Sequence, residues 1–209
     1  MQDGALYHQL KLGPWDNFIH LLIDRPTRSC AVVDPAWDAA TILAEAERLD
    51  VTITHVLCTH SHFDHVDQVD ALLKHVDVPV HMLNHEVAWS GFACENLVTS
   101  APGDTIVVGR DLEITMMHTP GHTPGSTTLI VDDQYAFAGD LVSATGSPHA
   151  QNSYAFSWVR VAESLARLQE LAPTLTFAGH GTEPISASEL ESLNVQFGDR
   201  PLPAATDQD

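Results

Sequence analysis

The feature that most constrains this chain is a cluster of metal-ligating side chains directly after an apolar run. The segment 59–65 reads Thr-His-Ser-His-Phe-Asp-His, so three histidines and one aspartate fall within six residues. Imidazole nitrogens and carboxylate oxygens are ligands that Zn²⁺ and Fe²⁺ accept. Burying so many of these groups without compensation would be costly. The segment therefore predicts a metal site at the end of a strand over residues 53–58.

The spacing within this cluster has a geometric meaning. On an extended segment alternate residues point to the same side, so His60 and His62 can bind one ion together. A helix that begins near Asp64 would turn Asp64 and His65 toward a neighbouring point. One short turn can therefore serve two metals.

Three later segments add single candidate ligands. His122 lies between the turns of 119–126, Asp140 follows the apolar residues of 137–138, and His180 follows those of 177–178. A glycine stands beside each of these residues, which lets the backbone approach closely. Such an arrangement is typical of strand ends that open at one edge of a sheet.

Taken in this order, the motifs resemble those of the metallo-β-lactamase superfamily, and within it those of the hydroxyacylglutathione hydrolases (glyoxalase II). They are Asp34, His60-x-His62-x-Asp64-His65, His122, Asp140 and His180, and the resemblance covers about residues 12 to 197. It implies an α/β fold, the four-layer αβ/βα sandwich, with metals at one edge between two sheets. The strand and helix pattern alone predicts an α/β fold with two central sheets, and does not distinguish it from a doubly wound sheet.

The resemblance also implies a role for each ligand. A first metal would take His60, His62 and His122, a second Asp64, His65 and His180, and Asp140 would bridge both. It implies two divalent ions, zinc first with iron or manganese as alternatives, and a metal-activated hydroxide that attacks a thioester or related acyl group. Asp64 and Asp140 would be catalytic through the metals, with Tyr154 as a candidate proton donor. Asp34, Thr59, Thr123 and Ser126 would orient ligands.

Other functions share these motifs. A mononuclear iron enzyme like the persulfide dioxygenases would use His60, His122 and Asp140. A lactonase would use the whole ligand set together with Tyr154. A metal-binding protein without activity is disfavoured by the complete set. Glutathione recognition is in doubt, because 142–148 lacks the Cys-Gly-Lys/Arg type of stretch and only Arg200 is basic after His180.

Composition limits the partners. Nine Lys and Arg stand against 28 Asp and Glu, a net charge of −19, which disfavours nucleic acid and anionic membranes. We expect one domain over 1–209 with a frayed tail at 201–209, and a small-molecule acyl substrate. The three cysteines form no Cys-x-x-Cys motif, no apolar stretch is long enough to span a membrane, and a cytoplasmic location follows as the expectation. The oligomeric state stays open.

The pattern also predicts most elements. Helices are expected over 39–49, 65–75, from a cap at Ser157 to 171, and from the capping box Ser186–Glu189 to about 197. Strands are expected over 18–23, 29–33, 53–58, 78–82, 106–108, 112–117, 127–131, 135–138 and 175–178.

Overall fold

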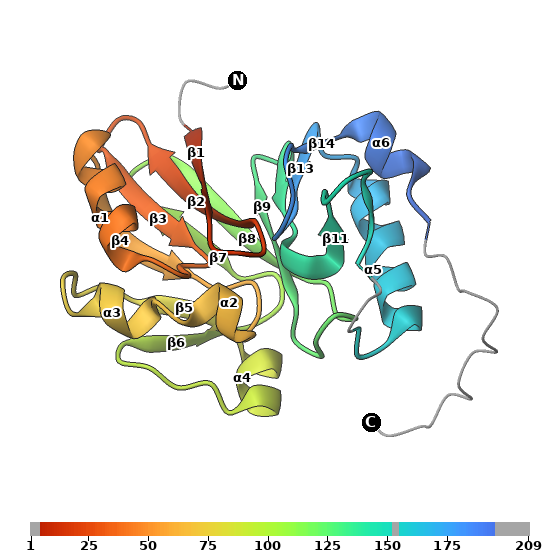
Figure 1. Cartoon of the computed structure of the whole chain (residues 1–209), viewed down its shortest axis with the longest axis horizontal. Coiled ribbons are helices and arrows are strands. Elements are labelled where there is room, and N and C mark those ends of the chain that lie inside the picture. Colours follow the sequence, from red (N-terminus) through yellow and green to blue (C-terminus); the bar gives the residue numbers. More distant parts are fainter. Residues whose placement is uncertain (1–4, 152–154, 195–209) are drawn as a thin grey trace.

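The computed structural model describes residues 5–151 and 155–194 (Figure 1). Tyr154 and the expected tail at 201–209 lie outside the described residues. Within them, two six-stranded sheets face each other and helices cover their outer faces. In Figure 1, α1 and α3 lie on one side of the strands, and α5 and α6 lie on the opposite side. This arrangement confirms the predicted αβ/βα sandwich and excludes the doubly wound sheet.

The first sheet is built from the N-terminal half of the chain. Its first three strands run antiparallel, and the pairs from β3 to β6 run parallel. In spatial order the strands are β1 (Ala5–Leu12), β2 (Asn17–Asp24), β3 (Ser29–Val33), β4 (Thr52–Leu57), β5 (Val80–Leu83) and β6 (Leu97–Ser100).

The second sheet is built from the C-terminal half. All its described pairs are antiparallel except β10 with β13, which run parallel. In spatial order the strands are β14 (Ile185–Ser186), β13 (Leu175–Phe177), β10 (Tyr135–Phe137), β9 (Thr127–Val131), β8 (Leu112–His118) and β7 (Thr105–Val108). A short turn η1 (Gly139–Leu141) leads into a small hairpin, β11 (Val142–Ser143) with β12 (His149–Ala150).

The helices begin where the sequence predicts a cap. The Asp38 carboxylate accepts from the first turn of α1 (Ala39–Arg48), and the Ser157 hydroxyl does so for α5 (Trp158–Leu171). Ser186 and Glu189 form the predicted capping box of α6 (Ala187–Ser192). The remaining helices are α2 (Phe63–Val66), α3 (Val69–Leu73) and α4 (Asn84–Ser90).

Three apolar layers hold the sandwich together. Alternate residues of β2 serve two of them: Leu21 and Ile23 pack toward α1 and α3, and Leu22 packs between the sheets. The third layer joins the second sheet to α5 and α6, with Leu165 and Leu190 among its members. All of β2 is buried, as expected for a strand covered on both faces.

Two helix predictions need correction. The expected helix over 65–75 is split into α2 and α3. The backbone N–H of Gln68 donates to the Pro35 carbonyl instead of continuing the helical hydrogen bonds. The last helix ends at Ser192, since Leu193 is extended. The sequence patterns also missed β1, α4 and β6, and α4 is important for the site.

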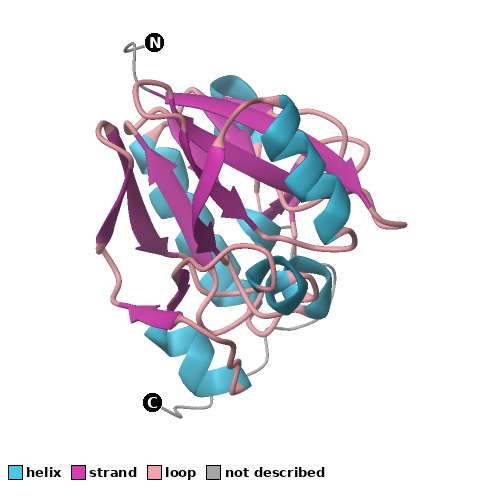
Figure 2. Cartoon of the chain, turned by 90° about the vertical axis from the view of Figure 1, so that its left-hand side faces the viewer, coloured by secondary structure: helices cyan, strands magenta, loops and turns pink. Residues whose placement is uncertain are grey.

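The strand ends meet at one edge of the molecule. β3 and β4 are parallel, as are β10 and β13, so the segments after each pair leave from the same edge of their sheet. Backbone hydrogen bonds join the two halves there, among them Phe18 N–H to the Gly179 carbonyl at 2.8 Å and Thr127 N–H to the Thr59 carbonyl at 2.9 Å. Figure 2, viewed from the side of α1, shows helices lying across the strands. No helix among the described residues has the length and apolarity needed to cross a membrane.

Candidate metal centre

The fold brings all seven predicted ligands to this edge. They divide into a first set, His60, His62 and His122, and a second set, Asp64, His65 and His180, each of which presents ligand atoms within 4.8 Å of one another. Asp140 lies against both sets. The residues come from the loops after β4, β8, β10 and β13, so segments far apart in the sequence build one site.

The second set has separations suited to one ion. His65 Nε2 lies 3.4 Å from His180 Nε2 and 3.5 Å from Asp64 Oδ2, and His180 Nε2 lies 3.4 Å from the same oxygen. A tetrahedral zinc with bonds of about 2.0–2.1 Å holds neighbouring ligand atoms roughly 3.3–3.4 Å apart. The second set therefore has the edge lengths of a tetrahedral zinc site.

Asp140 connects the two sets. Its Oδ2 lies 3.3 Å from His180 Nε2 and 3.4 Å from His122 Nε2, and its Oδ1 lies 3.5 Å from His65 Nε2. One carboxylate thus faces imidazoles of both sets.

The first set is three imidazoles that converge. His62 Nδ1 and His122 Nε2 lie 2.9 Å apart, and the ring centroid of His60 lies 4.7 Å and 4.9 Å from those of His62 and His122. His60 Nε2 is buried and has no hydrogen-bond partner among the described residues, and neither does Asp140 Oδ1. Unpartnered buried acceptors are costly unless something binds them. The donor set and these unpartnered atoms fit a metal.

The electrostatics of the centre separate the two sets. Burial lowers the pKa of His122 to about 4 and holds the pKa of His60 well below its usual value. Burial also disfavours charge on His65, but the surrounding carboxylates, Asp140 first, outweigh it and raise the pKa of His65 to about 9. Burial would raise the pKa of Asp140, yet the facing imidazoles, His65 first, hold it far below its usual range. His60 and His122 of the first set are thus neutral, and neutral imidazole is the form that binds metals.

Asp34 binds the loop that carries the ligands after β4. Its carboxylate accepts from Thr59 N–H at 2.7 Å, from Thr59 Oγ1 at 2.6 Å, and lies 3.0 Å from His65 Nδ1. Thr59 Oγ1 in turn lies 3.1 Å from His60 Nδ1. The predicted orienting roles of Asp34 and Thr59 therefore correspond to direct contacts with one histidine of each set.

Two supporting residues were not predicted as site residues. The Asn17 amide donates to the Asp64 backbone carbonyl at 2.8 Å and to Asp64 Oδ2 at 3.0 Å. The buried Glu86 of α4 binds the two loops that carry the first set. No periodicity could have found Glu86, because α4 is only seven residues long. Thr123 and Ser126, predicted to orient ligands, bond to each other, and Thr123 bonds to Glu86.

Aromatic rings border the second set. Trp15, Trp37 and Phe63 contact one another with ring centroids 5.2–5.9 Å apart. The Trp15 carbonyl lies 2.9 Å from His180 Nδ1, and Trp37 donates from Nε1 to Asn17 at 2.8 Å. Trp15 and Phe63 are 51% and 56% exposed, so this rim presents apolar surface beside the candidate ligands.

Two further histidines bond to groups outside the ligand sets. His118 Nε2 lies 2.9 Å from the Pro124 carbonyl, and its ring stacks on His85. His149 is exposed and contacts the Ser147 carbonyl at 2.9 Å. Cys58 is buried, and burial raises the pKa of its thiol well above its usual value, as expected for a small apolar core residue.

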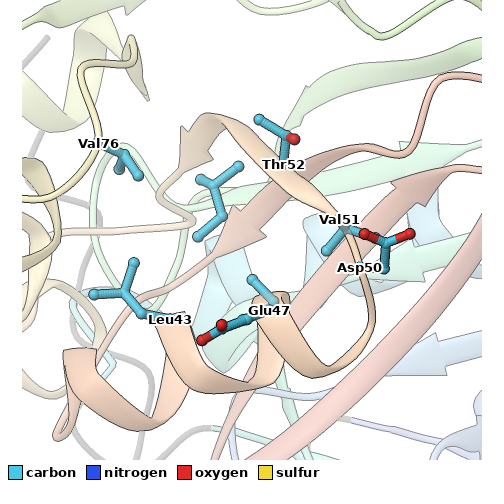
Figure 3. Close-up of a pocket in the computed structure, with 8 residues that line it drawn as sticks. Leu43, Glu47, Asp50, Val51, Thr52 and Val76 are labelled. Carbon is cyan, nitrogen blue, oxygen red and sulfur yellow. The ribbon is translucent and has the colours of Figure 1, made fainter.

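A separate hollow lies between α1 and the start of β4 (Figure 3). It contains none of the candidate ligands. Its lining residues are Leu43, Ala46, Glu47, Asp50, Val51, Thr52, Ile53 and Val76.

Comparison with known proteins identifies the family. The family model described as the metallo-beta-lactamase superfamily matches residues 20–180, which contain every candidate ligand. The chain therefore belongs to the metallo-beta-lactamase superfamily, as its motifs predicted.

Individual relatives share about a third of their residues with this chain or fewer. A protein of Bacillus velezensis named "probable polyketide biosynthesis zinc-dependent hydrolase BaeB" is 34% identical over 67% of this chain and 60% of its own length. A hydroxyacylglutathione hydrolase of Rhodospirillum rubrum is 33% identical over 79% of this chain and 62% of its own length. The chain thus spans about three fifths of each. Among solved structures, ETHE1 from Myxococcus xanthus superposes with a TM-score of 0.74 at 29% identity, over 90% of this chain and 82% of that one.

Proposed function

We propose that this protein is a dinuclear metal-dependent hydrolase that cleaves thioesters or related acyl compounds. The observation that carries the proposal is the set of 3.3–3.5 Å separations among His65, His180, Asp64 and Asp140, with Asp140 also facing His122. Relatives named as a zinc-dependent hydrolase and as a hydroxyacylglutathione hydrolase support it.

The residues divide the work of holding the metals. His60, His62 and His122 would hold one ion, Asp64, His65 and His180 the other, and Asp140 would bridge them. Two bound zinc ions would make water a nucleophile at neutral pH and polarise an acyl carbonyl. Iron or manganese would suit the same ligands.

The chain's own residues keep this arrangement in place. Asn17 fixes the Asp64 side chain and its backbone carbonyl together, and Asp34 fixes the ring of His65 through Nδ1. Asp34 leaves Nε2 of His65 free for a metal, and Asn17 contacts the same Asp64 oxygen that faces His65 and His180. Held ligands of this kind let a bound substrate meet its nucleophile without rearrangement of the site.

A thiolate leaving group suits this centre. The carboxylates and imidazoles described around the centre are candidate ligands or, like Asp34 and Glu86, already accept hydrogen bonds from the ligand loop. A thiol has a pKa of about 8.5, so a thiolate departs without a proton from the protein, whereas an amide nitrogen needs an acid. Tyr154, outside the described residues, remains our candidate donor for lactone cleavage.

The aromatic rim supports an acyl substrate with an apolar part. Trp15 and Phe63 offer half-exposed rings beside the second set. The chain has a net charge of −19, which opposes nucleic acid as a substrate.

The test combines metal content with a matched substrate series. We expect two metals per chain, rapid hydrolysis of a small acyl thioester, slower hydrolysis of the matched lactone, and little hydrolysis of the amide. Asp140→Ala should remove nearly all activity, and Tyr154→Phe should slow only the lactone. One iron per chain that excess metal does not change would favour the mononuclear dioxygenase. A lactone rate far above the thioester rate, lost in Tyr154→Phe, would favour the lactonase.

A further inference from the structure

The geometry points to Glu86 as the positioning residue of the first metal: its side chain ties together the two loops that deliver His60, His62 and His122. This inference rests on the proposed metal centre and adds a residue outside every motif described above.

Glu86 makes contacts that reach both loops. Its Oε1 accepts from Ser61 N–H at 2.9 Å and from Ser61 Oγ at 2.6 Å. Its Oε2 accepts from Thr123 Oγ1 at 2.7 Å and from Gly125 N–H at 3.0 Å. Ser61 stands between His60 and His62, and Thr123 follows His122. One carboxylate thus joins the neighbours of all three histidines.

The packing around Glu86 leaves little freedom. Glu86 is 0% exposed, so its oxygens have no water to replace a lost partner. A Cβ on Gly125 would overlap the backbone nitrogen and Cα of Glu86 and lie 2.5 Å from its Cβ. The loop after β8 can therefore lie against α4 only because residue 125 is glycine. This contact places the backbone of both loops, and with it the three rings.

Among the described residues, no cationic side chain forms an ion pair with the Glu86 carboxylate. None of the ion pairs among the described residues includes it, and its four donors are hydroxyls and backbone amides. A buried carboxylate without a cation is costly. A divalent ion held by the adjacent histidines would offset that cost.

The second set is held by other residues. Asn17 holds Asp64, Asp34 holds His65, and the Trp15 carbonyl contacts His180 Nδ1. A change at Glu86 should therefore act on the first metal and spare the second.

The matched control is Asp24. It is also 0% exposed, and it also joins two loops through a hydroxyl and backbone amides: it accepts from Thr27 Oγ1 and from the amides of Thr27, Arg110 and Asp111. Asp24 is the last residue of β2 and contacts the turn after β7, whereas the candidate ligands lie near the first residues of β2. Asp24→Asn therefore removes a buried carboxylate of the same kind without touching the metal loops.

The experiment measures the two stepwise zinc affinities by competition with a chelating dye, together with the melting temperature of the metal-free protein. Glu86→Gln should weaken one affinity by about 10–100-fold, the usual effect of losing a residue that supports a ligand, and leave the other within about threefold. Asp24→Asn should lower the melting temperature and change neither affinity. In cobalt-loaded protein, Glu86→Gln should also change the d–d absorption of one ion.

A milder variant covers the case in which Glu86→Gln does not fold. Ser61→Ala removes one of the four donors and should weaken the same single affinity by a smaller factor. Wild-type affinities in either folded variant, or an equal loss of both metals, would overturn the role of Glu86. Wild-type protein that binds no zinc would instead overturn the proposed function, so the two failures can be told apart.

Discussion

Adding one methyl group at Gly179 should disable the centre without removing a ligand. Gly179 lies directly before His180, and its backbone is not in the left-handed region, so alanine is compatible with its conformation. An added Cβ would overlap Asp140 Oδ1 and lie 2.8 Å from His65 Cε1. Both groups belong to the candidate metal centre.

The size of the effect follows from these contacts. Carbon atoms pack at about 3.5 Å or more, so His65 must move by roughly 0.7 Å, and Asp140 must move further. A displacement of about 1 Å at a catalytic group can cost on the order of 100-fold in rate. Overpacking costs about 1–3 kcal/mol of unfolding free energy, a drop of about 2–12 °C in melting temperature.

The assay compares Gly179→Ala with wild type in zinc content, thioester turnover with excess zinc, and melting temperature. We expect less than two metals per chain and a turnover reduced on the order of 100-fold. The control is Gly103→Ala, where no atom lies within 4 Å of the added Cβ and only the positive φ of 89° is strained. It should lose about 1–2 kcal/mol of stability and keep full metal and activity. Gly179→Ala with two metals and wild-type turnover would refute the geometry described here.

Three further predictions concern the chelated protein, the core and the rim. Chelation should lower the melting temperature, because metal that binds only the folded state contributes about 2.7 kcal/mol per site at 100 times its Kd; an unchanged temperature would contradict a metal-supported fold. Burial lowers the pKa of His20 to about 3, so His20 contributes stability above pH 6.5 that is lost as the pH falls toward 3. In urea denaturation of the metal-free proteins, His20→Gln should therefore lose less unfolding free energy between pH 6.5 and 4 than wild type. An identical loss in both proteins would contradict this. Trp15→Ala should raise KM for long-chain acyl thioesters by about tenfold, or ~1.4 kcal/mol. The control Trp89→Ala changes a tryptophan of α4 that is 50% exposed, and it should leave KM unchanged. Equal effects of the two variants would exclude the rim from substrate binding.

The sequence by itself predicted the ligand types and the strand ends that carry them. His60, His62, Asp64 and His65 could be recognised because ligand chemistry belongs to the side chain and their spacing is local. Helix caps such as Asp38 and Ser157 could be predicted for the same reason, since a cap bonds to residues two or three positions away.

Only the tertiary structure decided how these residues meet. Asp140 faces His122 and His180 because β10 and β13 pair in parallel at the edge where the loop after β8 also ends. Glu86 lies 25 residues from Ser61 and 39 from Gly125, and α4 is too short to show a periodic pattern. Local patterns describe neighbours along the chain. A buried carboxylate that joins two distant loops becomes visible only when the packing of both sheets has brought those loops together.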